Sequence, residues 1–213
     1  MTVFAGEGLA CLRGERAVFA RLSFRVEAGG VLLLRGANGS GKSSLLRCMA
    51  GLLAPMAGSL TWDGEAVLRD VESHRRRLRF LGHLDAVKAA LTVAEDLALH
   101  QQLHGLRDPA AIGDALSRLG IDPLAGLPTR LLSAGQRRRV ALARLLAAPA
   151  PLWLLDEPTN ALDDDGVRRF AGIVRDHCIA GGIAVIAAHG DPGIAGDVLS
   201  LADYVPRPMD PAA

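Results

Sequence analysis

One eight-residue segment constrains the fold of this chain more than any other. Gly36 to Ser43 (GANGSGKS) fits the pattern G-x4-G-K-[ST] and directly follows the apolar run Val31 to Arg35. The pattern predicts a tight turn between a buried strand and a helix, because glycine lets a backbone turn sharply and approach an anion closely. Backbone N–H groups and the positive end of the helix would then cradle phosphate groups. The residues predicted to form the cradle are Gly36, Ala37, Asn38, Gly39, Ser40, Gly41, Lys42, Ser43 and Ser44.

Two side chains of this loop add chemistry of their own. Lys42 supplies a positive charge for the β and γ phosphates of a nucleotide, and the Ser43 hydroxyl can complete the coordination shell of Mg²⁺. The loop therefore predicts binding of ATP together with Mg²⁺.

Apolar runs alternate with helical segments along much of the chain, a pattern typical of an α/β fold with a largely parallel sheet. The runs at 31–34, 152–155 and 183–187 have no polar face, so each predicts a strand that is covered on both sides. Residues 17–26 alternate near their end, and residues 59–67 surround an Asp-Gly pair. These two segments predict an antiparallel strand and a hairpin.

Between about residues 84 and 132 the strand pattern disappears. Thr92 and Glu95 have the spacing of a capping box, and Asp108-Pro109 is typical of a second helix start. We therefore expect one domain, residues 1–213, in which a helical subdomain is inserted into an α/β core.

The apolar run Leu152 to Leu155 ends in two acidic residues, Asp156 and Glu157. Ligands gather at the carboxyl ends of strands in a parallel sheet, so both carboxylates are expected beside the phosphates. Asp156 is predicted to hold Mg²⁺ with Ser43, directly or through water. Glu157 is predicted to polarise the attacking water.

A histidine follows the next predicted strand. His189 comes directly after the run that ends at Ala187, with only Ala188 between them. That position predicts a sensor of the γ-phosphate at the same edge of the sheet. The predicted catalytic residues are thus Lys42, Glu157 and His189.

A second helix start precedes a basic stretch. Leu132 to Gln136 (LSAGQ) stands before the helical segment Arg137 to Arg144. Ser133 and Gln136 have capping-box spacing, so a helix N-terminus that favours an anion is predicted here. The run Arg137 to Arg139 predicts a solvated helix face beside the phosphates rather than a nucleic-acid contact.

These motifs, in this order and with the Ala161-Leu162-Asp163 loop, resemble those of the ABC-transporter ATPases over nearly the whole chain. The resemblance implies a P-loop NTPase fold of the ABC type, with a mixed, mainly parallel sheet core, an antiparallel β subdomain and the helical insertion. It also implies a head-to-tail homodimer, in which the signature motif of one subunit contacts ATP held by Lys42 of the other. The signature residues are Leu132, Ser133, Ala134, Gly135 and Gln136. Hydrolysis would then require dimerisation.

Three segments narrow the resemblance: residues 11–16, 22–24 and 132–145 are similar to the cytochrome c maturation ATPases, which are heme-exporter subunits. This similarity implies an ATP-hydrolysing subunit on the cytoplasmic face of the inner membrane, with transmembrane subunits as partners and no direct contact with the cargo. Two alternatives stay open. One is a transporter ATPase for a different cargo, and the other is a soluble ABC protein that acts on ribosomes or DNA. Proteins of the second kind usually carry two nucleotide-binding cassettes in one chain or a long coiled-coil insertion. This chain has a single cassette and no heptad repeat over the insertion, which argues against that alternative.

Two positions depart from the family pattern. The loop before the helical insertion normally carries a glutamine, whereas this chain has His83 and Leu84 there. The aromatic residue that usually stacks on adenine is also missing. Arg13 is the nearest candidate, because a guanidinium can stack on a purine. Whether His83 or Leu84 replaces the glutamine stays open.

The overall charge excludes some partners. Lys and Arg total 24 against 23 Asp and Glu, a net charge of +1, so no general field attracts nucleic acid or an anionic bilayer. The best membrane-span candidate, Val140 to Leu155, is too short and contains Arg144 and two prolines. We expect no signal peptide, no direct membrane insertion and a cytoplasmic chain. The prolines after Asp203 predict an irregular chain end.

Overall fold

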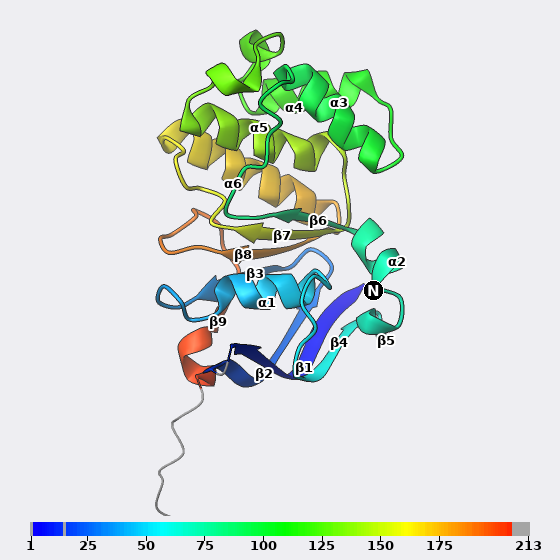
Figure 1. Ribbon diagram of the computed structural model, residues 1–213, viewed down its shortest axis with the longest axis vertical. Coiled ribbons are helices and arrows are strands. Elements are labelled where there is room, and N and C mark those ends of the chain that lie inside the picture. Colours follow the sequence, from blue (N-terminus) through cyan, green and yellow to red (C-terminus); the bar gives the residue numbers. More distant parts are fainter. Residues whose placement is uncertain (1, 15, 206–213) are drawn as a thin grey trace, which may run out of the picture.

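Two sheets organise the computed structural model, which describes residues 2–14 and 16–205 (Figure 1). The parallel sheet has the order β6-β7-β8-β3-β9, and the antiparallel sheet has the order β2-β1-β4-β5. The parallel strands are β3 (Val31–Arg35), β6 (Leu78–Leu81), β7 (Leu152–Asp156), β8 (Ile183–Ala187) and β9 (Asp197–Ser200). The antiparallel strands are β1 (Val3–Arg13), β2 (Arg16–Glu27), β4 (Ala57–Trp62) and β5 (Glu65–Ala66). Most of the predicted irregular chain end lies outside the described residues.

Helices cover both faces of the parallel sheet. The α-helices are α1 (Lys42–Met49), α2 (Val71–Arg76), α3 (Val93–Leu103), α4 (Pro109–Arg118), α5 (Ala134–Ala147) and α6 (Asp164–Ile179). Figure 1 shows α1 between the two sheets, α6 above the parallel sheet, and α3, α4 and α5 at the top. The molecule is therefore layered, with the parallel sheet in the middle.

The parallel sheet separates two hydrophobic cores. Successive residues of a strand point to opposite faces, so Leu32 and Leu34 of β3 pack with α1 and the antiparallel sheet, whereas Leu33 packs with the upper helices. This arrangement confirms the prediction that β3 is covered on both sides. β7 and β8 are likewise fully buried.

The antiparallel predictions are also confirmed. β2 pairs with β1, and β4 and β5 form the predicted hairpin. Asp63 and Gly64 both have positive φ, 53° and 83°, as a two-residue turn with right-handed strand twist requires. The sequence did not predict β1, β6 or β9.

The segment from 84 to 132 consists of helices, turns and one isolated bridge between Thr92 and Pro128. The capping box at the start of α3 is formed, because Thr92 and Glu95 bond to each other's backbone N–H groups. Pro109 occupies the first turn of α4, which Asp108 caps. Both helix starts are where the sequence predicted them.

Within the described residues, no helix is long and apolar enough to span a membrane. The segment Val140 to Leu155 is divided between the end of α5 and most of β7. This division agrees with the two prolines that separate its halves.

Candidate active site

The glycine loop connects β3 to α1, as predicted, and α1 begins at Lys42. The N-cap of α1 is Gly41, whose φ of 103° is left-handed. A side chain at Gly41 would also collide with Val18 of β2, so glycine is required on two grounds. No side chain caps α1. The backbone N–H groups of its first turn therefore remain available for a ligand.

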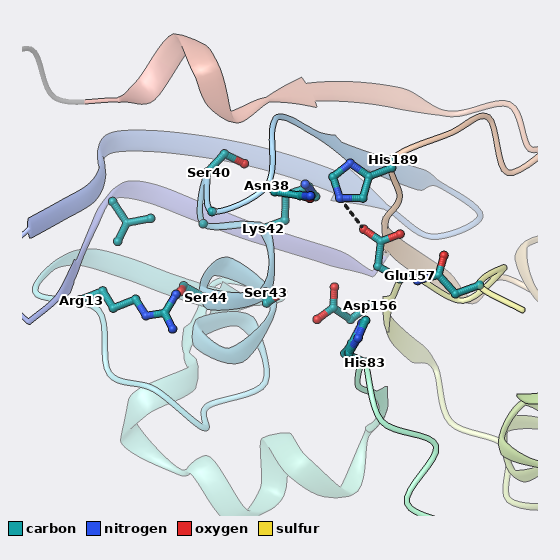
Figure 2. A pocket seen from close by; sticks show the side chains of 14 residues that line it. Arg13, Asn38, Ser40, Lys42, Ser43, Ser44, His83, Asp156, Glu157 and His189 are labelled. Atoms are coloured by element: carbon teal, nitrogen blue, oxygen red, sulfur yellow. Dashed lines mark ion pairs between the residues drawn. The ribbon is translucent and has the colours of Figure 1, made fainter. Parts of the chain in front are cut away.

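Lys42 is the charged centre of the loop. Its side chain is buried, with the residue 6% exposed, and its Nζ donates to the carbonyl oxygens of Gly36 at 2.7 Å and Ala37 at 3.2 Å. The loop thus curls around the ammonium group that it presents (Figure 2). These two carbonyl oxygens therefore hold the ammonium group at the glycine loop.

Three further groups come from the carboxyl ends of β7 and β8. Asp156 ends β7, and Glu157 follows it with its N–H bonded to the carbonyl oxygen of Ala187 at 2.8 Å. His189 lies just beyond β8, with its Nε2 3.4 Å from the Glu157 Oε1. Figure 2 shows this pair facing the glycine loop from the opposite side. The predicted strand ends therefore meet at one edge of the sheet.

Glu157 has an unusual backbone. Its φ is 52°, in the left-handed region, which costs about 1–2 kcal/mol for a residue with a Cβ atom. Its N–H bonds to β8, and its carbonyl oxygen accepts from the N–H of Asn160 and from the side chain of Arg138. These contacts hold the carboxylate in a direction that an ordinary strand continuation would not give.

These groups line one cavity of about 400 Å³. Its lining residues are Arg13, Val18, Asn38, Gly39, Ser40, Gly41, Lys42, Ser43, Ser44, His83, Asp156, Glu157, Asn160 and His189. Two residues of the predicted cradle, Gly36 and Ala37, support Lys42 instead of lining the cavity.

Only one of the two candidates for the missing glutamine lines the cavity. His83 lines it, whereas Leu84 is 79% exposed and does not. Arg13 lines the same cavity, beside Val18. Sequence reasoning missed Val18, for which no motif exists, and Asn160, which follows Glu157 by one turn and could have been included on that ground.

The LSAGQ segment lies at a second cavity. Its capping box is complete, because the Gln136 N–H donates to Ser133 Oγ at 3.2 Å and the Ser133 N–H donates to Gln136 Oε1 at 2.8 Å. Ser133, Gly135 and Gln136 line a cavity of about 470 Å³. Leu132 is buried in the upper core, and Ala134 is exposed outside the cavity lining. This cavity shares no lining residue with the first.

Ala161 and Asp163 of the Ala161-Leu162-Asp163 loop also line the second cavity. A Cβ atom on Gly135 would lie 2.7 Å from the Ala161 carbonyl oxygen, so only glycine allows this close approach. Arg139 pairs with Asp163 at 2.5 Å. The Gly166 N–H and then the Arg139 guanidinium lower the pKa of Asp163. The helix start and the loop therefore form one surface.

One prediction for the basic run is wrong. The sequence predicted that Arg137 to Arg139 form a solvated helix face, but Arg138 is buried, at 2% exposed. Its guanidinium reaches the end of β7, which carries the acidic pair. Arg137 and Arg139 are half-buried and bond to the Leu132 and Leu119 carbonyl oxygens.

Comparisons with known proteins agree with this geometry. The family model described as ABC transporter matches residues 19–160. A cytochrome c biogenesis ATP-binding export protein CcmA from Rhodospirillum rubrum is 52% identical over 97% of this chain and 88% of its own length. The protein of the same name from Paramagnetospirillum magneticum is 49% identical over 96% of this chain and 99% of its own.

A solved structure shares the fold. It is a putative ABC transporter ATP-binding protein from Pyrococcus furiosus, with a TM-score of 0.86 and 24% sequence identity, and the match covers 96% of this chain and 100% of that one. The fold, the order of the motifs and the sequence identity agree. This chain belongs to the ABC transporter family and, within it, to the cytochrome c biogenesis ATP-binding export proteins.

Proposed function

We propose that this chain is the ATP-hydrolysing subunit of an inner-membrane ABC complex that serves heme export in cytochrome c maturation. One observation carries the ATPase part: a single cavity collects the Lys42 ammonium, the carboxylates of Asp156 and Glu157, and the His189 ring. The names of the relatives support the pathway. Transmembrane subunits would hold the chain on the cytoplasmic face, and the cargo would not contact it.

The glycine loop would bind the triphosphate. The free N–H groups at the start of α1 and those of the loop offer donors to phosphate oxygens, and the helix end favours negative charge. Lys42 would move its ammonium from the carbonyl oxygens of its own loop to the β and γ phosphates.

Mg²⁺ fits the same place. The Ser43 hydroxyl and the Asp156 carboxylate line the cavity and are oxygen donors, which this cation prefers. In the described part of the chain, no group of three His, Cys, Asp or Glu residues could hold a metal. The remaining ligands would therefore be phosphate oxygens and water, as is usual for nucleotide-bound Mg²⁺. When bound, the ion neutralises charge that develops on the phosphates.

Glu157 and His189 would carry out the water attack. The Glu157 carboxylate is buried and directed into the cavity, where it orients a water molecule and polarises it toward the γ-phosphate. His189 lies within reach of that carboxylate and would donate a hydrogen bond to the γ-phosphate. Transition-state charge would thus be stabilised by groups that are already in place.

Arg13 and His83 would replace the two missing family residues. Arg13 lies in the cavity lining beside Ser44 in Figure 2, where its guanidinium could stack on the adenine ring. His83 projects toward Asp156 in the same view and would report the state of the metal site.

The second cavity would act on a nucleotide held by another copy. Ser133, Gly135 and Gln136 line it, and it shares no lining residue with the cavity of Lys42. A head-to-tail homodimer would complete both sites at once. Residues 1–213 would then act as one nucleotide-binding domain, with residues 84–132 as its helical subdomain.

Calorimetric titration of the purified chain with Mg-ATP tests the binding part. We expect saturable binding that is lost in Lys42→Ala and kept in Lys88→Ala, since Lys88 is exposed and outside the cavity lining. Equal binding by both variants would refute the loop assignment.

A deletion strain tests the pathway. We expect c-type cytochromes to be lost and then restored by the wild-type gene, but not by the Glu157→Gln variant. Normal c-type cytochromes in the deletion, combined with intact ATP hydrolysis in vitro, would indicate a different cargo.

A further inference from the structure

The side chain of Arg138 connects three segments: α5, on which it lies, the end of β7, and the turn after β6. A guanidinium has five N–H donors in a rigid planar fork, and each of its three nitrogen atoms is used here. The acceptors are the carbonyl oxygens of Asp156 (2.9 Å), Glu157 (2.5 Å), Pro158 (3.1 Å) and Gly82 (3.2 Å), and Asp85 Oδ1 (3.0 Å).

Three of these acceptors are consecutive. Arg138 binds the carbonyl oxygens of residues 156–158, which span the point where β7 ends and Glu157 enters its left-handed conformation. A strained conformation persists only when its surroundings determine it. Together with the bond from the Glu157 N–H to β8, this contact fixes the backbone on both sides of the Glu157 side chain.

The other two acceptors belong to the turn after β6. Gly82 and Asp85 flank His83, so the same guanidinium also holds the turn that brings this ring into the cavity. Arg144 supports the turn from the next part of α5, by donating to the Asp85 and Ala86 carbonyl oxygens. α5 begins with the signature residues, so Arg138 links the signature helix to both loops.

Lysine could not replace this arginine. Its ammonium has three donors on a single nitrogen atom, whereas the five acceptors here are shared among the three nitrogen atoms of a planar guanidinium. The Asp85 carboxylate is the counter-charge that a buried guanidinium needs, and its side chain is 23% exposed. The arrangement is therefore specific to the shape of the guanidinium as well as to its charge.

We infer that Arg138 is a positioning residue for hydrolysis, which holds Glu157 in its attacking geometry and keeps it in register with the signature helix. The inference rests on the proposed ATPase function. Arg138 lies outside the cavity lining and would act only through the loops that it binds.

The first test is Arg138→Lys in the full-length chain. We expect kcat to fall by about tenfold to a hundredfold, because a displacement of about 1 Å at a reacting group costs that much. The Kd for Mg-ATP should change less than about twofold, because the glycine loop is untouched. An unchanged kcat in a folded Arg138→Lys protein would overturn the inference.

Arg79 provides a matched control. It is also a buried arginine, 5% exposed, and donates to backbone carbonyl oxygens of Leu78, Ala148 and Pro149, away from the cavity. Arg79→Lys should lower the melting temperature but keep kcat per folded molecule. If both variants lose kcat equally, Arg138 has only a structural role.

A double variant separates positioning from general damage. In a Glu157→Gln background, Arg138→Lys should reduce the residual rate by less than about twofold, because its target is already disabled. An equal fold loss in both backgrounds would overturn the inference.

If Arg138→Lys fails to fold, Asp85→Asn replaces it, with an expected kcat loss of about threefold to tenfold. An unchanged kcat in a folded Asp85→Asn protein would then count against the inference.

The proposed function can fail separately. A wild-type chain that neither binds nor hydrolyses ATP would refute the ATPase assignment, and this inference with it. Hydrolysis by the wild type with no response to Arg138→Lys would refute the inference alone.

Discussion

The glycine loop and the LSAGQ segment both place a helix N-terminus at a cavity, yet they differ in how that N-terminus is satisfied. α1 begins at a left-handed glycine and has no side-chain cap. α5 begins with a complete capping box, in which Ser133 and Gln136 satisfy each other's N–H groups. The N–H groups of the first N-terminus are therefore open to an external anion, whereas the capping box of the second already satisfies part of its donors.

The two cavities also differ in the charged groups that line them. The first is lined by an ammonium, a guanidinium, two carboxylates and two imidazoles. The second holds Arg139 and Asp163, which pair with each other. The first surface thus presents several charged and titratable groups, whereas the charged side chains of the second neutralise each other.

The largest effect should come from removing the charge of the first surface. Lys42→Ala should lower kcat/KM by about a thousandfold, because the ammonium stabilises charge on the transferred phosphoryl group. Hydrolysis assays with Lys88→Ala as the control measure this. Turnover near the wild-type rate would break the comparison, since the first surface would then not depend on its charge.

Glu157→Gln should keep binding and lose chemistry. The amide retains the shape of the side chain but cannot accept a proton, so kcat should fall by about 10²–10³-fold. With ATP, the variant should accumulate as a dimer in size-exclusion chromatography. A variant that stays monomeric with bound ATP would contradict the head-to-tail arrangement.

Ser133→Arg tests the second surface alone. The bulky cation should block the approach of another subunit, and we expect hydrolysis to fall by about a hundredfold. Calorimetry on the monomer should show an unchanged Kd for ATP. Weakened binding by the monomer would mean that both cavities serve the same nucleotide.

The smallest effect is a pH dependence in the helical region that carries the second surface. Burial, followed by the nearby charge of Arg144, lowers the pKa of His100 to about 3. The unfolded chain therefore takes up a proton that the folded one refuses, so the free energy of unfolding decreases as the pH falls below about 6.5. His100→Gln should lessen this decrease between pH 6.5 and 4.5 by about 1–2 kcal/mol, measured by urea unfolding. An identical pH profile would show that the ring is solvated.

Residues with a fixed chemical task were predictable from the sequence. The glycine loop and the two capping boxes need particular residue types at a particular spacing, and the Asp156-Glu157 pair is marked by the apolar run that it ends and by the presence of the glycine loop. The short strands β6 and β9, and the longer β1, were not predictable, because no turn motif or long apolar run marks them.

The burial of Arg138 was missed for a different reason. Three successive arginines look alike in a sequence, and only tertiary contacts separate them. A signal was nevertheless present, since Arg138, Ala141, Leu142 and Leu145 follow helical spacing and are all buried. An arginine on the apolar stripe of a helix is better interpreted as a buried donor than as part of a solvated face.

The upper core has a consequence for how the molecule unfolds. Side chains from the parallel sheet, from α6 and from the helices of residues 84–132 belong to one continuous cluster, in which Leu97 of α3, Leu116 of α4 and Leu155 of β7 take part. Deleting the segment would expose to water the apolar side of α5, against which α3 and α4 pack, and would invite aggregation. Heating should accordingly melt the helices and the sheet in a single cooperative transition. Residues 84–132 are thus an insertion in the sequence, but their side chains belong to the same hydrophobic core as those of the parallel sheet.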